Sequence, residues 1–189
     1  MRVLIIPEDP TLDRHILKPI VERIFQEIGR KAQIEMLEDP HLTGVSHALN
    51  QETIQGIIAD NPMVSLFLLM VDRDGPNSGH EQATARLEET HARVLRTCLA
   101  IEEVEVWMIA LHRDKLGVSW GEVRAHRDPK EAFVWPFLEK MGWRATVGRG
   151  YKRAMRELAG QFRGLVAVCP EIAELQIKIQ QWSEGTSEM

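Results

Sequence analysis

The residues of this chain best suited to chemistry are carboxylates that directly follow apolar segments. The segments are "RVLIIP", "LFLLMV" and "CLAI", and the acids are Glu8, Asp9, Asp72, Asp74, Glu102, Glu103 and Glu105. Carboxylates held close together repel one another and raise each other's pKa, so such a cluster normally needs a cation to offset the cost. Hard oxygen ligands favour Mg²⁺ or Mn²⁺ over zinc. These acids therefore form a candidate site for Mg²⁺ or Mn²⁺.

Asp72 and Asp74 are the most informative pair of acids. On an extended chain the side chains at positions i and i+2 face the same way, so these two carboxylates can converge on one ion. A simpler interpretation exists for each acid alone, because the residue after a strand is where Asp and Glu cap a following helix. Recurrence after several apolar segments favours a shared site over separate caps.

The segments that must position these acids alternate between strand-like and helix-like patterns. Strands are expected over 2–8, 32–37, 63–72 and 97–104, and helices over 11–29, 45–61, 80–96 and onward from 104 or 105. The near-continuous apolar run before Asp72 predicts a central strand of a sheet covered on both faces. The order predicts an α/β fold with a mostly parallel sheet flanked by helices. Ligands gather at the carboxyl ends of the strands in such sheets, which is where the acids fall.

The pattern changes after residue 117, where tryptophans, glycines and short helical segments appear without a clear strand. We therefore expect residues 1–117 to form the α/β core and residues 118–189 to form a mainly helical extension packed on it. A chain of 189 residues is long enough to bury one sizeable core.

Composition excludes several other classes of protein. The chain is 44% hydrophobic and 27% charged, as in ordinary globular proteins. No apolar run approaches the roughly 20 residues that cross a bilayer, so no membrane partner is expected. The apolar stretch in the opening "MRVLIIPEDP" is too short for a signal peptide. Cys98 and Cys169 lack the spacing of a zinc site or of a redox motif. Reduced thiols and a cytoplasmic location are the prediction.

The net charge of −5 is distributed unevenly along the chain. Residues 1–105 contain 10 Lys+Arg and 18 Asp+Glu, whereas residues 106–163 contain 12 and 6. Positive charge is densest in "GWRATVGRGYKRAMRE", which contributes Arg144, Arg149, Lys152, Arg153 and Arg156. With glycines for close backbone approach and Tyr151 for stacking, this segment is a candidate nucleic-acid contact. A solvated helix face is the alternative for the same residues.

Taken together, the acids resemble the metal-binding pattern of the TOPRIM fold, which is found in topoisomerases, primases and OLD-type nucleases. Glu8 matches the Glu after the first strand, and Asp72 and Asp74 in "MVDRDG" match the later Asp-x-Asp. The chain is most similar to a family of small uncharacterised bacterial TOPRIM-like proteins, through Glu105 in "EVW" and Lys130 in "PKE". The resemblance covers roughly residues 2–182.

The resemblance implies metal-dependent phosphodiester cleavage with Mg²⁺ or Mn²⁺. It implies Glu8, Asp72, Asp74 and Glu105 as direct or water-mediated metal ligands, with Glu8 or Glu105 as an alternative general base. Lys130 would neutralise the reacting phosphate, or would instead be a solvated helix-start lysine. Asp9 stands where TOPRIM domains usually have Gly, which leaves either an additional ligand or a degenerate site.

Two other functions stay open. A receiver-like phospho-acceptor domain would use Glu8, Asp9, Asp72 and Lys130, although it leaves Asp74 and Glu105 without a role. A partner-dependent subunit with a degenerate site is the other alternative, because TOPRIM-like proteins of this kind are often associated with ATPases in bacterial defence. Self-association into a homo-oligomer is compatible with either function.

Overall fold

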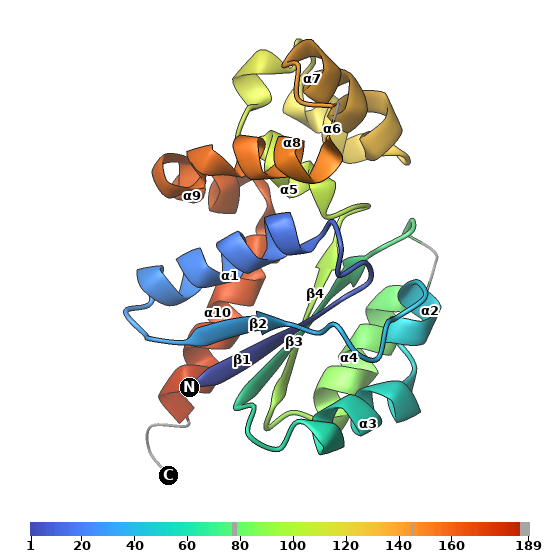
Figure 1. Cartoon of the computed structure of the whole chain (residues 1–189), viewed down its shortest axis with the longest axis vertical. Coiled ribbons are helices and arrows are strands. Elements are labelled where there is room, and N and C mark those ends of the chain that lie inside the picture. The colour runs from blue at the N-terminus through green and yellow to red at the C-terminus, as the bar shows by residue number, and fades with distance from the viewer. Residues whose placement is uncertain (77–78, 145, 186–189) are drawn as a thin grey trace.

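A computed structural model describes residues 1–76, 79–144 and 146–185 of the chain. Its centre is a four-stranded, all-parallel sheet with the order β2-β1-β3-β4 and helices around it (Figure 1). The strands are β1 (Arg2–Pro7), β2 (Gln33–Met36), β3 (Leu66–Asp72) and β4 (Leu95–Ala100). The predicted α/β fold with a mostly parallel sheet is confirmed.

Helices connect the strands and make up the C-terminal region. Those between strands are α1 (Arg14–Glu27), α2 (Val45–Ala48), α3 (Gln51–Asp60) and α4 (His80–Thr90). After β4 come α5 (Glu105–Ala110), the 3₁₀ turn η1 (Arg113–Lys115), α6 (Trp120–Ala125), the π-helical turn η2 (Lys130–Val134), α7 (Trp135–Lys140), α8 (Val147–Ala154), the 3₁₀ turn η3 (Met155–Glu157), α9 (Leu158–Val168) and α10 (Pro170–Gly185). None of the helices in the described part of the chain has the length and apolar character needed to cross a membrane.

The single helix predicted over 45–61 is two helices in the structure. Asn50 has an extended backbone, and its side chain accepts a hydrogen bond of 3.0 Å from the backbone N–H of Thr53. This is the geometry of an N-cap, so a new helix begins after Asn50. The prediction was wrong because the apolar spacing continues across the break.

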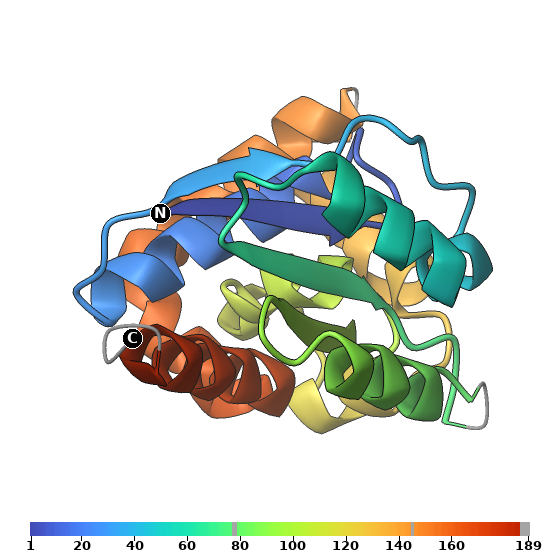
Figure 2. The ribbon, with the colours of Figure 1, turned by 90° about the horizontal axis from the view of Figure 1, so that it is seen from below.

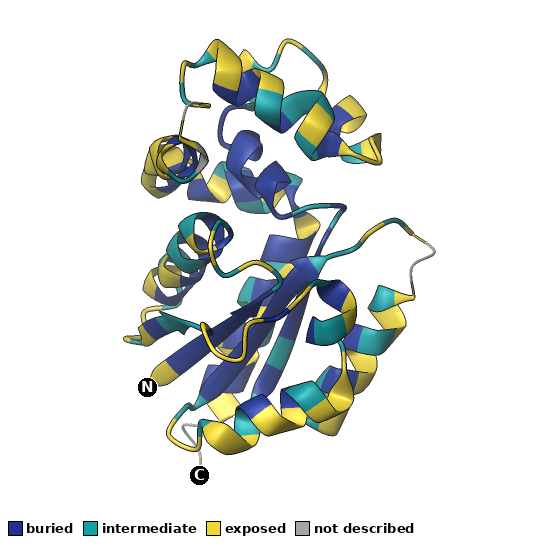
Figure 3. Cartoon of the chain, turned by 45° about the vertical axis from the view of Figure 1, so that its right-hand side comes forward, coloured by how far each residue is buried: buried dark blue, intermediate teal, exposed yellow. Residues whose placement is uncertain are grey.

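The sheet register brings the ends of the strands to one edge. Strand β3 is central and buried along its whole length until Asp72, which is partly exposed (Figure 3). Pro7 pairs with Met70, and Asp72 pairs with Ala100. The chain segments that follow β1, β3 and β4 therefore leave the sheet at the same edge, as parallel pairing requires.

Helices cover both faces of the sheet (Figure 2). Ile54 of α3 and Leu87 of α4 belong to the buried cluster on one face. Ile16 of α1 and Leu175 of α10 belong to the larger cluster on the other face, together with residues of α5 to α9. The C-terminal region thus supplies part of the covering layer of the sheet, because α10 packs against β4.

A buried charged group fastens α10 to the rest of the molecule. Glu171 is only 8% exposed and accepts two hydrogen bonds of 2.9 Å from Arg124 of α6. It also accepts a hydrogen bond of 2.8 Å from the indole N–H of Trp107 in α5. Bidentate pairing and the extra donor satisfy the buried carboxylate. α5, α6 and α10 are therefore joined around one residue.

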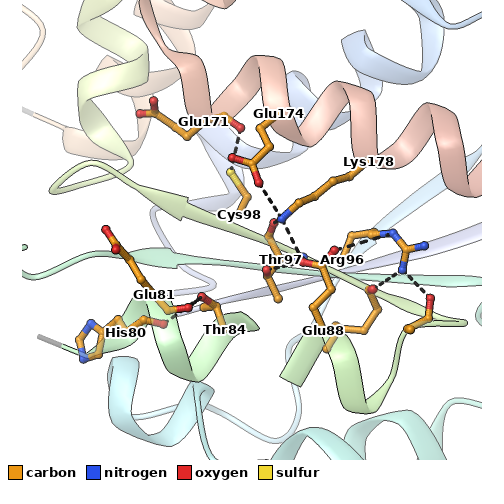
Figure 4. Close-up of polar contacts among 12 residues, drawn as sticks. His80, Glu81, Thr84, Glu88, Arg96, Thr97, Cys98, Glu171, Glu174 and Lys178 are labelled. Atoms are coloured by element: carbon orange, nitrogen blue, oxygen red, sulfur yellow. Dashed lines mark hydrogen bonds and ion pairs between the residues drawn. The ribbon is translucent and has the colours of Figure 1, made fainter. Parts of the chain in front are cut away.

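Side chains of α4 and α10 close the outer edge of β4 (Figure 4). A carboxylate oxygen of Glu88 accepts hydrogen bonds from the backbone N–H of Thr97 at 3.0 Å and from its hydroxyl at 2.6 Å. Lys178 of α10 donates to the carbonyl oxygen of Thr97 at 3.2 Å and to the same Glu88 oxygen at 3.0 Å. An edge strand with occupied polar groups is protected from pairing with another chain.

We predict that Lys178→Met lowers the free energy of unfolding by about 1–3 kcal/mol, because Glu88 and the Thr97 carbonyl lose a shared donor. The melting temperature should fall by roughly 2–4 °C for each kcal/mol in a chain of this size. Thermal unfolding is the measurement, with Lys31→Met as a control that removes an exposed lysine. Equal melting temperatures for the two variants would contradict a stabilising role of Lys178 at this edge.

Candidate metal centre at the carboxyl edge of the sheet

Glu8 follows β1, and its carboxylate lies beside the N-terminus of α2. A Cβ atom added at Gly44 would lie 3.9 Å from Oε1 of Glu8. The other oxygen, Oε2, is buried and has no hydrogen-bond partner among the described residues. Burial and the charge of Asp74 raise the pKa of Glu8, although the backbone N–H groups of Val45 and Asp72 act in the opposite direction. One buried oxygen of Glu8 is therefore free to accept a ligand.

Asp72 ends β3 and is the point on which the acids converge. Its Oδ1 accepts a hydrogen bond of 2.9 Å from the backbone N–H of Val104, just before α5. Burial raises its pKa well above the usual range, and the negative charges of Glu105, Asp13 and Glu8 raise it further. Carboxylates from the chain after β1, from the start of α1 and from α5 therefore all act on Asp72.

Asp74 lies outside the strand, so the extended geometry predicted for the Asp72–Asp74 pair is wrong. Its backbone is left-handed, with φ of 54°, and its side chain is exposed. Glu102 stabilises this turn, because it pairs with Arg73 and accepts a hydrogen bond of 2.7 Å from the backbone N–H of Gly75. Asp74 still lies close enough to Glu8 to raise the pKa of that residue.

Glu105 is the first residue of α5 and is almost completely buried, with 1% exposure. Its Oε1 lies 2.5 Å from Nζ of Lys130 and accepts a hydrogen bond of 3.0 Å from the hydroxyl of Tyr151. Burial acts to lower the pKa of Lys130, but Glu105, Glu103 and Asp72 together raise it. The structure thus places the side chain of Lys130 in contact with the acid cluster.

Asp13 is a member of the cluster that the sequence analysis missed. It is 7% exposed, and its Oδ2 accepts a hydrogen bond of 3.1 Å from the backbone N–H of Asp9. Burial raises its pKa to about 8, with Glu105 and then Asp9 as further causes. An acid on the first turn after β1 was visible in the sequence, but its inward direction depends on how α1 packs.

Glu103 is half-buried beside the same lysine. Its Oε2 accepts a hydrogen bond of 2.7 Å from the backbone N–H of Lys130. Burial raises its pKa to about 7, and the negative charge of Glu105 contributes. The first turn of η2 is therefore held against the segment that follows β4 through both the backbone and the side chain of Lys130.

Asp9 and Glu102 have structural roles instead. Asp9 is exposed, and its Oδ1 accepts a hydrogen bond of 2.7 Å from the backbone N–H of Thr11. Glu102 holds the turn after β3 through Arg73 and Gly75. Asp9 therefore stabilises the turn before α1 and does not cap the helix, and we confine the metal-centre interpretation to the other acids.

The basic segment predicted to contact nucleic acid is divided in the structure. Arg144 pairs with Glu139 at 3.0 Å and lies over the ring of Trp135, with 5.4 Å to the ring centroid. Lys152 and Arg156 instead line a groove beside α1. Arg149 and Arg153 are exposed on α8.

Two further expectations for this segment were wrong. Tyr151 is completely buried and bonded to Glu105, so it has no face free for stacking on a base. A Cβ atom at Gly150 would lie 2.5 Å from the carbonyl oxygen of Trp143, and one at Gly148 would lie 3.0 Å from Nε2 of His15. Both glycines therefore permit close packing within the protein.

The chemistry of the donor set fits a hard divalent cation. Its donors are carboxylate oxygens, and the buried Oε2 of Glu8 has no partner in the described part of the chain. Within the same residues, however, no three His, Cys, Asp or Glu side chains are already arranged to hold one ion. Oε1 of Glu105 already pairs with Lys130 and accepts a hydrogen bond from Tyr151. Asp13 and Asp72 each accept a hydrogen bond from a backbone N–H group. A cation would thus have to be accompanied by rearrangement of these contacts.

Comparisons of the chain with protein-family models, with curated proteins and with solved structures give no match. The carboxyl edge is therefore interpreted from its own geometry and charges.

The raised pKa values predict how stability depends on pH in the absence of metal. A carboxyl group with a higher pKa in the folded protein binds more protons when folded, so the free energy of unfolding falls as pH rises towards that pKa. For Asp13 this window extends from its ordinary value of 3.8 to about 8. Between about pH 5 and pH 8, wild type should lose roughly 2–4 kcal/mol more than Asp13→Asn, at about 1.4 kcal/mol for each pKa unit.

Urea unfolding in EDTA at several pH values measures this difference. Asp60→Asn is the control, because Asp60 is an exposed carboxylate at the end of α3. Parallel pH profiles for wild type and Asp13→Asn would show that Asp13 carries no unfavourable charge in the folded protein.

Proposed function

We propose that the carboxyl edge binds Mg²⁺ or Mn²⁺ and supports hydrolysis of phosphodiesters in the manner of TOPRIM-like nucleases. The observation that carries this proposal is the convergence of Glu8, Asp13 and Glu105 on Asp72, where each carboxylate raises the pKa of Asp72. Such repulsion costs folding energy, which a divalent cation would offset. Many proteins retain unfavourable charge of this kind because a functional site requires it.

Glu8 and Asp72 are the first ligands in this proposal. They follow adjacent parallel strands, and one oxygen of Glu8 is buried without a partner among the described residues. Asp74 is exposed beside Glu8 and would add a ligand directly or through water. Glu105 would join only after release from Lys130. A bound divalent cation supplies an activated water and charge stabilisation at the phosphate.

Lys130 and two of the acids supply the remaining chemistry. The ammonium group of Lys130 lies inside the acid cluster, where it would stabilise negative charge on a reacting phosphate. Asp13 and Glu103 have pKa values raised to about 8 and about 7, so either group can hold or accept a proton near neutral pH. In the structure Glu105 is paired with Lys130, which favours Asp13 or Glu103 over Glu105 as the general base.

We also propose a cytoplasmic location, which suits the free and buried thiols of Cys98 and Cys169. An ATPase partner and a homo-oligomer stay within the proposal as conditions for activity. Asp9 stands where TOPRIM domains usually have glycine, and its side chain stabilises a turn. It therefore does not add a metal ligand. A site of this kind could require a partner to complete it.

Calorimetric titration of Mn²⁺ into wild type and Glu8→Gln/Asp72→Asn tests the metal centre. We expect wild type to bind Mn²⁺ and the variant to bind at least about tenfold more weakly, because two hard ligands are lost. Glu52→Gln/Asp60→Asn removes two exposed carboxylates from α3 and serves as the matched control. Cleavage of a labelled oligonucleotide with Mn²⁺, and its loss in EDTA, is then measured for the same three proteins.

Failure of wild type to bind Mn²⁺, or equal binding by all three proteins, would contradict the proposed centre. Binding by wild type without cleavage would support the centre and would favour the partner-dependent form of the proposal. Pull-down from a native host would then be the next measurement, with a stable ATPase partner as the expected result.

A receiver-like phospho-acceptor is the second candidate, because Glu8 and Asp72 lie at the carboxyl ends of adjacent strands and the charge of Asp72 raises the pKa of Lys130. Incubation with acetyl phosphate and Mg²⁺, followed by intact mass spectrometry, separates the two functions. We expect no adduct, because Oδ1 of Asp72 already accepts a hydrogen bond from Val104 and lies among other carboxylates. A gain of one phosphoryl group that disappears in Asp72→Asn would favour the receiver.

A further inference from the structure

A groove of 640 Å³ runs between α1 and the segment formed by α8 and η3. Helix α1 contacts both α8 and η3, and Figure 1 shows α8 lying above α1. We call this feature the α1/α8 groove; its charged lining consists of Arg14, Lys18, Lys152, Arg156 and Glu22, together with His15. Its volume lies in the range of ordinary ligand pockets, about 300–1,000 Å³.

Positive charge in the α1/α8 groove exceeds negative charge. Lys18 lies 4.0 Å from Glu22, and Arg14 pairs with Glu38 at 3.0 Å. Both pairs are exposed, and exposed pairs contribute little because water and salt screen them. Lys152 and Arg156 form no ion pair with any residue that the structure describes. Lys152 and Arg156 therefore line the same groove as Arg14 and Lys18, and no ion pair in the described part of the chain offsets the charges of Lys152 and Arg156.

Packing beneath the groove forces these charges together. Gly148 lets α8 approach until a Cβ atom at this position would lie 3.0 Å from Nε2 of His15. Met155 and Ile16 belong to the same buried cluster under the groove. Burial lowers the pKa of His15, and the charges of Lys152 and Arg14 lower it further. The fold therefore holds like charges in proximity, and a bound anion would relieve their repulsion.

We propose that the α1/α8 groove is a binding site for the phosphate groups of a nucleotide or of a nucleic-acid strand. Arg14 and Arg156 offer the planar donor geometry that matches phosphate oxygens, and Lys18 and Lys152 add compact charges. Pro19 and Met155 provide an apolar floor against which a sugar or base can pack. The site lies outside the acid cluster and binds phosphate whether or not that cluster hydrolyses it.

The position of the groove also relates it to the carboxyl edge. Asp13 is buried among the acids, whereas the adjacent Arg14 is exposed in the groove lining. The two charged regions therefore meet at the start of α1.

Fluorescence anisotropy with a labelled oligothymidylate of about 12 nucleotides, in EDTA and at about 50 mM salt, tests the site. The test variant is Lys152→Gln/Arg156→Gln. The control is Lys31→Gln/Arg86→Gln, which removes the same charge from exposed residues elsewhere. We expect the test variant to bind about tenfold or more weakly and the control to bind within about twofold of wild type. The slope of log affinity against log salt should flatten by about 1–2 in the test variant alone.

Pyrophosphate and a nucleoside diphosphate, added as competitors, distinguish the two sources of phosphate. Displacement of the oligonucleotide by either small molecule supports the site and identifies a nucleotide-sized ligand. Absence of displacement, with the variant effect retained, supports the site with a strand as its ligand. Equal losses in the test and control variants would overturn the proposal, as would failure of wild type to bind both the oligonucleotide and a labelled nucleoside diphosphate. Because the binding assay contains EDTA, its result does not depend on whether the carboxyl edge binds a divalent cation.

Discussion

Repulsion among carboxylates at the carboxyl edge is the constraint on which the rest of this structure depends. Parallel pairing delivers Glu8 and Asp72 to one edge, and the start of α5 adds Glu105. Because the edge is largely buried, the charges are not dispersed by water. The neighbouring elements supply donors instead, from the backbone at Val104 and from the side chains of Lys130 and Tyr151.

The C-terminal region is part of this solution. Lys130 and Tyr151 come from η2 and α8, beyond the segment that forms the sheet, yet both contact the same oxygen of Glu105. Glu171 in turn fixes α10 to α5 through Trp107. A chain ending near residue 117 would lack α10 on its face of the sheet and would lack both donors to Glu105. Fold and candidate site therefore require the same residues.

The sequence was sufficient for features that depend on local patterns. The continuous apolar run of β3 predicted a central strand, and the acids after the strands predicted where charge would gather. The sequence was insufficient for features that tertiary packing determines. Asp13 is buried where α1 packs. Tyr151 is buried and donates to Glu105, which lies 46 residues away in the chain. Asp74 lies in a left-handed turn that Glu102 stabilises through Gly75. Spacing alone contains none of these contacts.

The acid cluster at the carboxyl edge and the basic α1/α8 groove lie on either side of the start of α1. Asp13 is buried on the acidic side and the next residue, Arg14, is exposed on the basic side, so the two regions meet at the start of α1. An anion in the α1/α8 groove and a cation at the carboxyl edge would attract each other. By linkage, each would then strengthen binding of the other by the same factor. Under the two proposals, a phosphate ester that brings its own divalent cation would place its phosphate in the groove and its cation at the edge in a single binding event.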